Sequence, residues 1–156
     1  MKAYLDIETT FKGEISLVGV YIPDRGMIQL TGSRVTDVNI ESSLAGVETV
    51  VTFNGASFDL PFIRRVTGFD VLDVARHRDL LRDCRKRGIR GGLKRVEALF
   101  GIGRTSGVVD GREAPRLWYR FETEGDENAL WQLLEYNRED CMNLEILETI
   151  LDGMEG

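Results

Sequence analysis

Strand-like segments fill the first third of the chain and helix-like segments follow, and this order restricts the folds that the chain can adopt. Residues 3–8 form a short run of apolar and acidic side chains. Residues 16–22 are rich in valine, and the apolar run 27–30 follows the turn Pro23-Asp24-Arg25-Gly26. Two such runs joined by a short Pro/Gly turn predict an antiparallel hairpin. The β-branched segment 48–53 predicts a further, buried strand.

The later segments carry helical patterns. After Asn54-Gly55, Ser57 is a plausible N-cap, Pro61 fits a first helical turn, and Phe58, Phe62 and Val66 repeat as one apolar stripe. The pattern of residues 71–78 favours neither a helix nor a strand. Further helices are expected at 41–46, 80–86, 93–100, 113–124 and 128–151. Together the patterns predict one α/β domain over residues 1–156, with a mixed antiparallel and parallel sheet flanked by helices.

Composition excludes several classes of protein. The 156 residues are 42% hydrophobic and 29% charged, as in ordinary globular domains. No apolar run approaches the roughly 20 residues that span a bilayer, and an acid at position 6 comes too early for a signal peptide. Cys84 and Cys141 form no CxxC pair, and the single histidine is too little for a zinc site with them. We expect a reducing, cytoplasmic location.

Two acids stand two residues apart in the first strand. The two-residue period of a strand places Asp6 and Glu8 on one face and Ile7 on the other. Adjacent carboxylates in an apolar run repel each other and resist burial, and a hard divalent cation such as Mg²⁺ or Mn²⁺ relieves that repulsion. The alternative is an exposed edge strand with solvated acids.

Further polar residues follow at two later positions. Asp59 lies at a strand-to-helix junction, where it could simply cap the helix, and Asn54 could be a turn residue or could hold the loop against a ligand. Tyr136 and Asp140 are four residues apart on the last helix and therefore share a face. Taken alone, that face could be solvated.

The combination is more specific than its parts. Asp6-Ile7-Glu8-Thr9-Thr10, then Asn54-Gly55-Ala56-Ser57-Phe58-Asp59-Leu60-Pro61-Phe62, then Tyr136-Asn137-Arg138-Glu139-Asp140 occur in this order. Their order and content resemble the three motifs of the DEDD superfamily of 3′→5′ exonucleases in its tyrosine-bearing form. Segments around residues 77–81, 91–94 and 118 extend the similarity to the ribonuclease H-like, YprB-type branch.

This resemblance implies a ribonuclease H-like fold and the hydrolysis of DNA or RNA from a 3′ end. It implies two divalent cations, Mg²⁺ or Mn²⁺, held by Asp6, Glu8, Asp59 and Asp140, and an attacking water positioned by Tyr136. Within the same motifs, Thr9, Asn54 and Phe58 are expected to contact the substrate. Two alternatives keep the fold: an endonuclease of the ribonuclease H or resolvase kind, and a nucleic-acid-binding module without activity.

The charge is unevenly distributed. The net charge is −6, yet residues 76–95 hold nine basic and two acidic side chains, a net charge of +7, while the remaining residues sum to −13. We interpret Arg87, Arg90 and Lys94 as phosphate-binding residues, the alternative being a solvated amphipathic helix. A chain this short leaves little room for a separate specificity domain, so a partner protein could select the substrate.

Other candidates carry weaker expectations. Asp73 and Asp79 are expected to be helix caps or surface acids, and the less favoured alternative is that they lie just outside the metal ligands. His77 is expected to be structural or on the substrate side. Four aromatic residues are expected in the core, and the alternative is that they stack on bases. These are Trp118, Tyr119, Phe121 and Trp131.

Overall fold

A five-stranded mixed sheet forms the centre of the computed structural model, which describes residues 1–107 and 110–154. Its strand order is β3-β2-β1-β4-β5, with bounds Lys2–Thr9 (β1), Ile15–Ile22 (β2), Gly26–Thr31 (β3), Thr49–Thr52 (β4) and Arg76–Asp79 (β5). β1, β2 and β3 pair antiparallel, whereas β4 pairs parallel with both β1 and β5. The predicted hairpin and mixed sheet are therefore confirmed.

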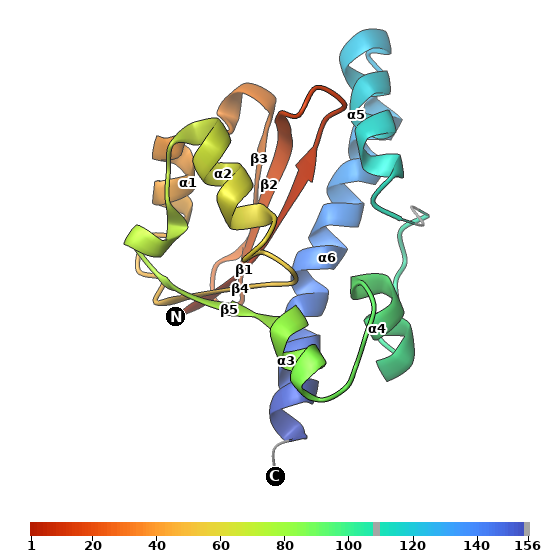
Figure 1. Ribbon diagram of the computed structural model, residues 1–156. Coiled ribbons are helices and arrows are strands. Elements are labelled where there is room, and N and C mark those ends of the chain that lie inside the picture. Colours follow the sequence, from red (N-terminus) through yellow and green to blue (C-terminus); the bar gives the residue numbers. More distant parts are fainter. Residues whose placement is uncertain (108–109, 155–156) are drawn as a thin grey trace.

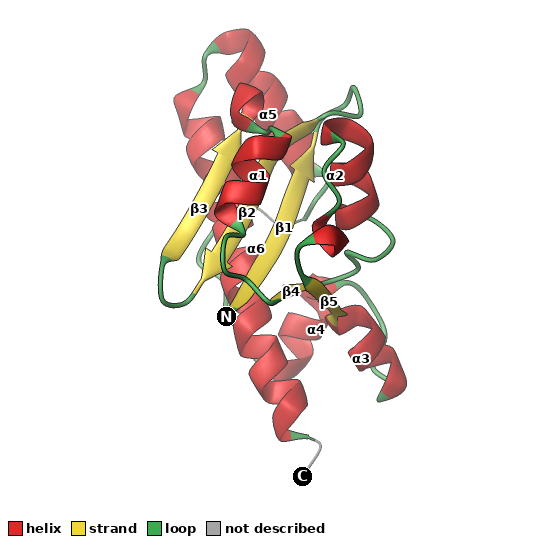
Figure 2. Cartoon of the chain, turned by 90° about the vertical axis from the view of Figure 1, so that its left-hand side faces the viewer, coloured by secondary structure: helices red, strands yellow, loops and turns green. Residues whose placement is uncertain are grey.

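Helices cover both faces of the sheet (Figures 1 and 2). Ala3, Leu5 and Ile7 of β1 pack in one core cluster with the helices α1 (Asp37–Ser43) and α2 (Asp59–Thr67). Tyr4 points the other way, into a cluster with the long helix α6 (Glu127–Gly153). This alternation puts Asp6 and Glu8 on the α6 face, as the two-residue period of a strand predicts.

The remaining helices mostly match the sequence pattern. The helices α3 (Leu80–Lys86), α4 (Leu93–Phe100) and α5 (Glu113–Glu124) have the expected bounds, and α5 packs beside α6. The expected helix at 41–46 is wrong in position, because the Thr36 side chain caps the Asn39 N–H and the helix starts earlier. The ambiguous segment 71–78 becomes the short 3₁₀ helix η2 (Val71–Asp73) and the polar edge strand β5.

The start of α2 differs from the sequence prediction. Ser57 is not the N-cap, because residues 54–58 form a loop and the helix begins only at Asp59. The expected stripe is wrong for Phe58 and Val66, which are 42% and 41% exposed, whereas Phe62 packs against the core. The helix turns Leu60 and Ile63 toward the sheet. Tertiary packing has therefore selected a different face of the helix from the one that the aromatic spacing indicated.

Within the residues that the structure describes, every helix is too short or too polar to cross a lipid bilayer.

Candidate active site

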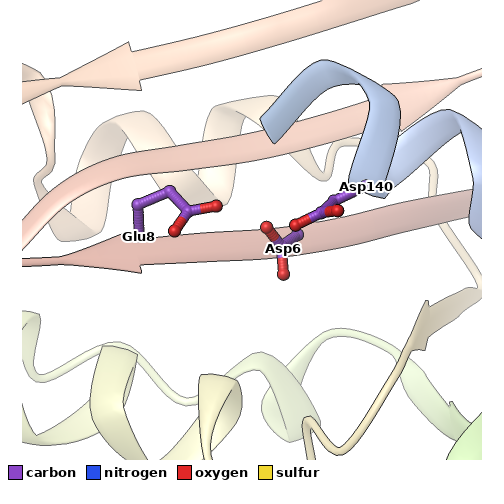
Figure 3. Close-up of side chains that lie close together, drawn as sticks. All are labelled: Asp6, Glu8 and Asp140. Carbon is purple, nitrogen blue, oxygen red and sulfur yellow. The ribbon is translucent and has the colours of Figure 1, made fainter. Parts of the chain in front are cut away.

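Three carboxylates from two distant segments meet on the α6 face of the sheet. Asp6 and Glu8 project from β1, and Asp140 projects from the middle of α6, where that helix crosses the strand (Figure 3). Each side chain offers an oxygen, and these oxygens all lie within 4.8 Å of one another. Glu8 and Asp140 are buried, and Asp6 is partly exposed. The three form the acidic cluster of the site.

Burial and mutual repulsion disfavour the charged forms of Asp6 and Glu8. Burial, followed by the charge of Asp140, raises the pKa of both Asp6 and Glu8 well above the ordinary range. Glu8 Oε1 is moreover buried without a hydrogen-bond partner among the described residues. A buried, unpaired carboxylate oxygen is costly, and a cation that accepts several oxygen ligands removes that cost. The donor set therefore fits a divalent metal ion.

Asp59 stands beside the acidic cluster without joining it. Its Oδ2 accepts the Ile7 N–H at 3.0 Å. This donor is available because β4 pairs with β1 only along residues 2–4, so the backbone of Ile7 has no β4 partner. Burial raises the pKa of Asp59 to about 7, although its hydrogen bond from Ile7 opposes that shift. The structure thus groups three of the four expected metal ligands and holds the fourth against the strand that carries two of them.

Tyr136 lies one turn before Asp140 on α6 and is only 4% exposed. Burial, then the charges of Asp140 and Glu8, raises the pKa of its phenol far above neutrality. The phenol therefore keeps its proton and can donate a hydrogen bond, which suits a group that positions water better than a group that removes a proton.

Lys94 belongs to the acidic site. Its Nζ lies 2.6 Å from Asp140 Oδ1 and 4.5 Å from the centre of the Tyr136 ring. Arg87 instead donates to the backbone oxygens of Asp83 and Leu151, at 2.9 and 3.2 Å, and so ties α3 to the end of α6. The side chain of Arg90 is exposed. The three residues predicted to bind phosphate, Arg87, Arg90 and Lys94, thus lie in different environments, and their contact with phosphate stays a prediction.

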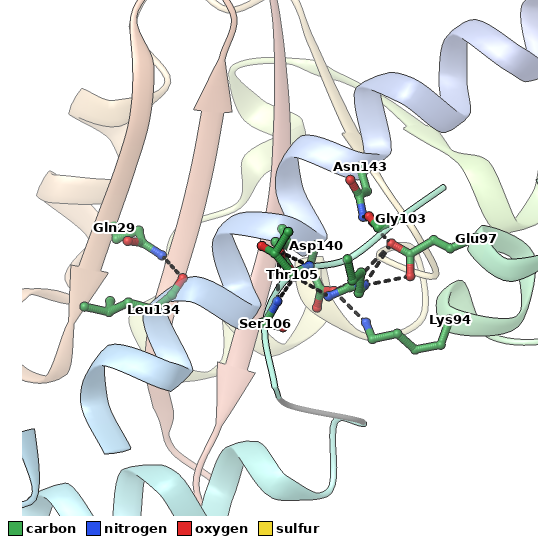
Figure 4. Close-up of polar contacts among 11 residues, drawn as sticks. Gln29, Lys94, Glu97, Gly103, Thr105, Ser106, Leu134, Asp140 and Asn143 are labelled. Atoms are coloured by element: carbon green, nitrogen blue, oxygen red, sulfur yellow. Dashed lines mark hydrogen bonds and ion pairs between the residues drawn. The ribbon is translucent and has the colours of Figure 1, made fainter. Parts of the chain in front are cut away.

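Arg104 and Glu97 are functional candidates that the sequence reasoning missed (Figure 4). Arg104 makes hydrogen bonds of 2.9–3.1 Å to both carboxylate oxygens of Glu97 and also contacts Asp140. Glu97, only 2% exposed, additionally accepts from Asn143 Nδ2 at 2.7 Å. Glu97 stands four residues after Leu93 on the apolar face of α4, and this spacing could have indicated a buried acid. Arg104 lies in an irregular loop whose sequence carries no comparable pattern.

That loop is fastened to α6 next to the site. The Glu139 carboxylate accepts the backbone N–H of Thr105 at 2.7 Å and that of Ser106 at 3.1 and 3.2 Å. Residues 103–106 consequently pass alongside Asp140 (Figure 4). The interaction gives Glu139, the residue directly before Asp140, a structural role.

Asn137 holds the Asp6 side of the site and was also missed. Its Nδ2 donates to both the backbone oxygen and Oδ2 of Asp6, each at 3.1 Å, while Gln29 Nε2 donates to its Oδ1 at 3.1 Å. Gly19, on the neighbouring strand β2, leaves the space: a Cβ there would lie 2.1 Å from Asn137 Oδ1. The amide thereby fixes the Asp6 carboxylate relative to α6.

The loop between β4 and α2 carries two of the expected substrate contacts. Asn54 is exposed with a φ of 65°, and its N–H donates to Asp79 Oδ1 at 2.7 Å. Asp79 also caps α3 through the Leu81 N–H, which confirms the helix-cap expectation for that residue. Phe58 is exposed, with its ring 5.3 Å from that of Phe62. Thr9, the third expected contact, ends β1 and is partly exposed.

The weaker candidates divide between core and surface. The His77 ring lies 2.8 Å from Thr52 Oγ1, which agrees with a structural role. Trp118 is buried in the core and Phe121 packs against it, whereas Tyr119 and Trp131 are 55% and 62% exposed. The core expectation is therefore wrong for these last two aromatics. Cys141 is fully buried and Asp73 is an exposed acid.

Comparisons with known proteins agree with the fold. The family model of the RNase_H superfamily matches residues 3–151. An uncharacterized protein of Methanocaldococcus jannaschii is 31% identical, with 89% of this chain and 88% of that protein covered. The structure superposes on the family B DNA polymerase of the archaeon Pyrobaculum calidifontis with a TM-score of 0.73 and 16% identity. That match covers 96% of this chain and only 24% of the polymerase chain, so it shows the shared fold.

Proposed function

Because the chain belongs to the RNase H superfamily, we propose that it is a metal-dependent nuclease that removes nucleotides from the 3′ end of DNA or RNA. The observation that carries the proposal is the acidic cluster, in which carboxylates of Asp6, Glu8 and Asp140 lie within 4.8 Å of one another. The buried and unpartnered Oε1 of Glu8 supports a bound cation at the same place.

The four acids match the ligands of Mg²⁺ or Mn²⁺. Asp6, Glu8 and Asp140 would hold the cations, with Asp59 as the fourth ligand on the α2 side, since hard divalent ions prefer carboxylate oxygens. Two bound cations would stabilise charge on the attacking and leaving oxygens of a phosphodiester and would generate the hydroxide nucleophile.

The surrounding side chains have roles that follow from their contacts. Asn137 orients the Asp6 carboxylate, and the protonated Tyr136 phenol donates to and positions the attacking water. Lys94 and Arg104 both contact Asp140, and Lys94 also lines the hollow at the acidic cluster, where its positive charge would meet an approaching phosphate. Each therefore acts by orienting or neutralising a group at the site.

A labelled-substrate panel tests the activity. Single- and double-stranded DNA and RNA, each labelled at the 5′ end, are incubated with Mg²⁺ or Mn²⁺. A ladder of progressively shortened products is expected, whereas cleavage of a circular strand would identify an endonuclease instead.

Two substitutions test the proposed ligands. Asp6→Ala and Asp140→Ala should each abolish metal-dependent cleavage and leave the circular dichroism spectrum unchanged. Asp6→Ala relieves the crowding of acids in the metal-free protein. In Asp140→Ala, the Arg104 guanidinium keeps Glu97 as its partner. Asp73→Ala, which removes an exposed acid of η2, is the matched control and should retain activity. Normal cleavage by either ligand variant would refute the metal assignment.

A further inference from the structure

A second hollow with several cationic side chains lies on the β5 side of the sheet. It has a volume of about 720 Å³ and is bounded by α2, η2, β5 and α3. Arg64 and Arg65 enter it from α2, and Arg82 enters it from α3. The metal-binding proposal uses none of these three residues. They define what we call the arginine pocket.

The positive charge of the arginine pocket is incompletely balanced. Asp70 is the one carboxylate among its lining residues, and its Oδ2 lies 3.8 Å from Arg64 Nη1. The Arg65 guanidinium stands 4.5 Å from the centre of the Phe62 ring. Across residues 1–107 and 110–154, neither Arg65 nor Arg82 forms an ion pair. Guanidinium groups without a carboxylate partner suit a phosphate, which they bind through parallel N–H donors.

One wall of the pocket is apolar. Leu60 and Pro61 of α2 line it together with Leu72 of η2, whose side chain is 59% exposed. The ring of His77 also lines the pocket, and burial lowers its pKa, so the imidazole is uncharged at neutral pH. Arginines beside an apolar wall fit a nucleotide, whose phosphate is charged and whose base has an apolar face. Only an unpaired strand presents such faces freely.

The arginine pocket continues a row of hollows that begins at the acidic cluster. The hollow at that cluster, of about 420 Å³, shares Phe53, Gly92 and Leu93 with an intermediate hollow of about 440 Å³. Asn54 lines this intermediate hollow, and Ala56, two residues later, lines the arginine pocket. Residues 53–56 therefore border all three hollows in turn. α2 and α3, which carry the arginines, flank this edge of the fold (Figure 2).

We propose that the arginine pocket binds a phosphate and its neighbouring base in a single-stranded nucleic acid whose 3′ end lies at the acidic cluster. The assignment rests on the proposed nuclease function for the position of that end. The substrate is then single-stranded, and the strand runs along the loop between β4 and α2. The binding itself needs no metal, so it can be measured apart from cleavage.

The test compares two double variants with the wild-type protein. Arg65→Ala with Arg82→Ala removes the two arginines that lack a carboxylate partner. Arg25→Ala with Arg34→Ala removes two charges from the β3 side of the sheet and is the matched control. The affinity for a labelled strand of about 16 nucleotides, near the upper end of common single-strand site sizes, is measured by anisotropy over a salt series without metal. A nucleoside monophosphate and a duplex of the same length are the comparison ligands.

The expected result is specific to the pocket double variant. Its log affinity should depend less steeply on log salt, by about 0.7, because the pocket holds one phosphate and each lost phosphate contact on a single strand removes about 0.7. The control should match the wild type, and the duplex and the monophosphate should bind more weakly than the strand. An unchanged slope in the pocket variant overturns the proposal, as does a monophosphate that binds as tightly as the strand. An arginine-dependent strand affinity in a protein that cleaves nothing would refute the nuclease function and leave the pocket assignment standing.

Discussion

Replacing Asp59 by asparagine should stabilise the metal-free protein at alkaline pH and leave its stability in acid nearly unchanged. The carboxyl has a folded-state pKa of about 7, whereas its pKa in an unfolded chain is close to 3.8. Between these values the folded protein holds a proton that the unfolded chain has released. The stability of the wild type therefore falls as the pH rises from about 4 to about 7 and stays low above that range.

The size of the effect follows from the shift in pKa. A difference of about 3 pH units at about 1.4 kcal/mol each amounts to about 4 kcal/mol, an upper limit because a charged site relaxes and admits water. The asparagine side chain of the Asp59→Asn variant cannot ionise, yet its amide oxygen can still accept the Ile7 N–H that Asp59 accepts at 3.0 Å. The variant should thus exceed the wild type in free energy of unfolding by as much as about 4 kcal/mol at about pH 8.

Urea unfolding in the presence of a chelator measures this difference at about pH 4.5 and about pH 8. Asp73→Asn, at an exposed acid, should show no comparable gain at either pH. Adding Mg²⁺ or Mn²⁺ at the higher pH should stabilise the wild type more than Asp59→Asn, because the variant has lost one proposed ligand. A variant no more stable than the wild type at about pH 8, or equally stabilised at both values, would show that the buried charge of Asp59 is not a source of strain.

Three further substitutions probe the support of the site. Arg104→Met should lower the free energy of unfolding by about 3–5 kcal/mol, because it leaves Glu97 buried without its cation; a loss below about 1 kcal/mol in urea unfolding would exclude that contact. Gly19→Ala should cost about 1–3 kcal/mol and reduce cleavage, since its Cβ would collide with Asn137; normal stability and turnover would contradict this packing. Asp140→Asn should remove the stabilisation that Mn²⁺ gives to the wild type, and an unchanged metal-induced shift in melting temperature would count against Asp140 as a ligand.

Local patterns were sufficient for much of the fold. The turn at residues 23–26 specified the hairpin, and the alternation in β1 placed Asp6 and Glu8 opposite Ile7. The bounds of α3, α4 and α5 also follow from local patterns. Strand β5 escaped prediction because its four residues are polar, and an edge strand next to a single neighbour needs no apolar signature.

The acidic site shows the same division between local and long-range information. The sequence alone determined which residue types are available: the paired acids of β1, and Tyr136 with Asp140 one turn apart on α6. Only the tertiary structure decided that Lys94 and Arg104 approach Asp140 and that Arg87 is directed to the end of α6. The physical reason is that the residue type fixes only which charge a side chain can carry. The partner that balances this charge depends on which distant segments pack together.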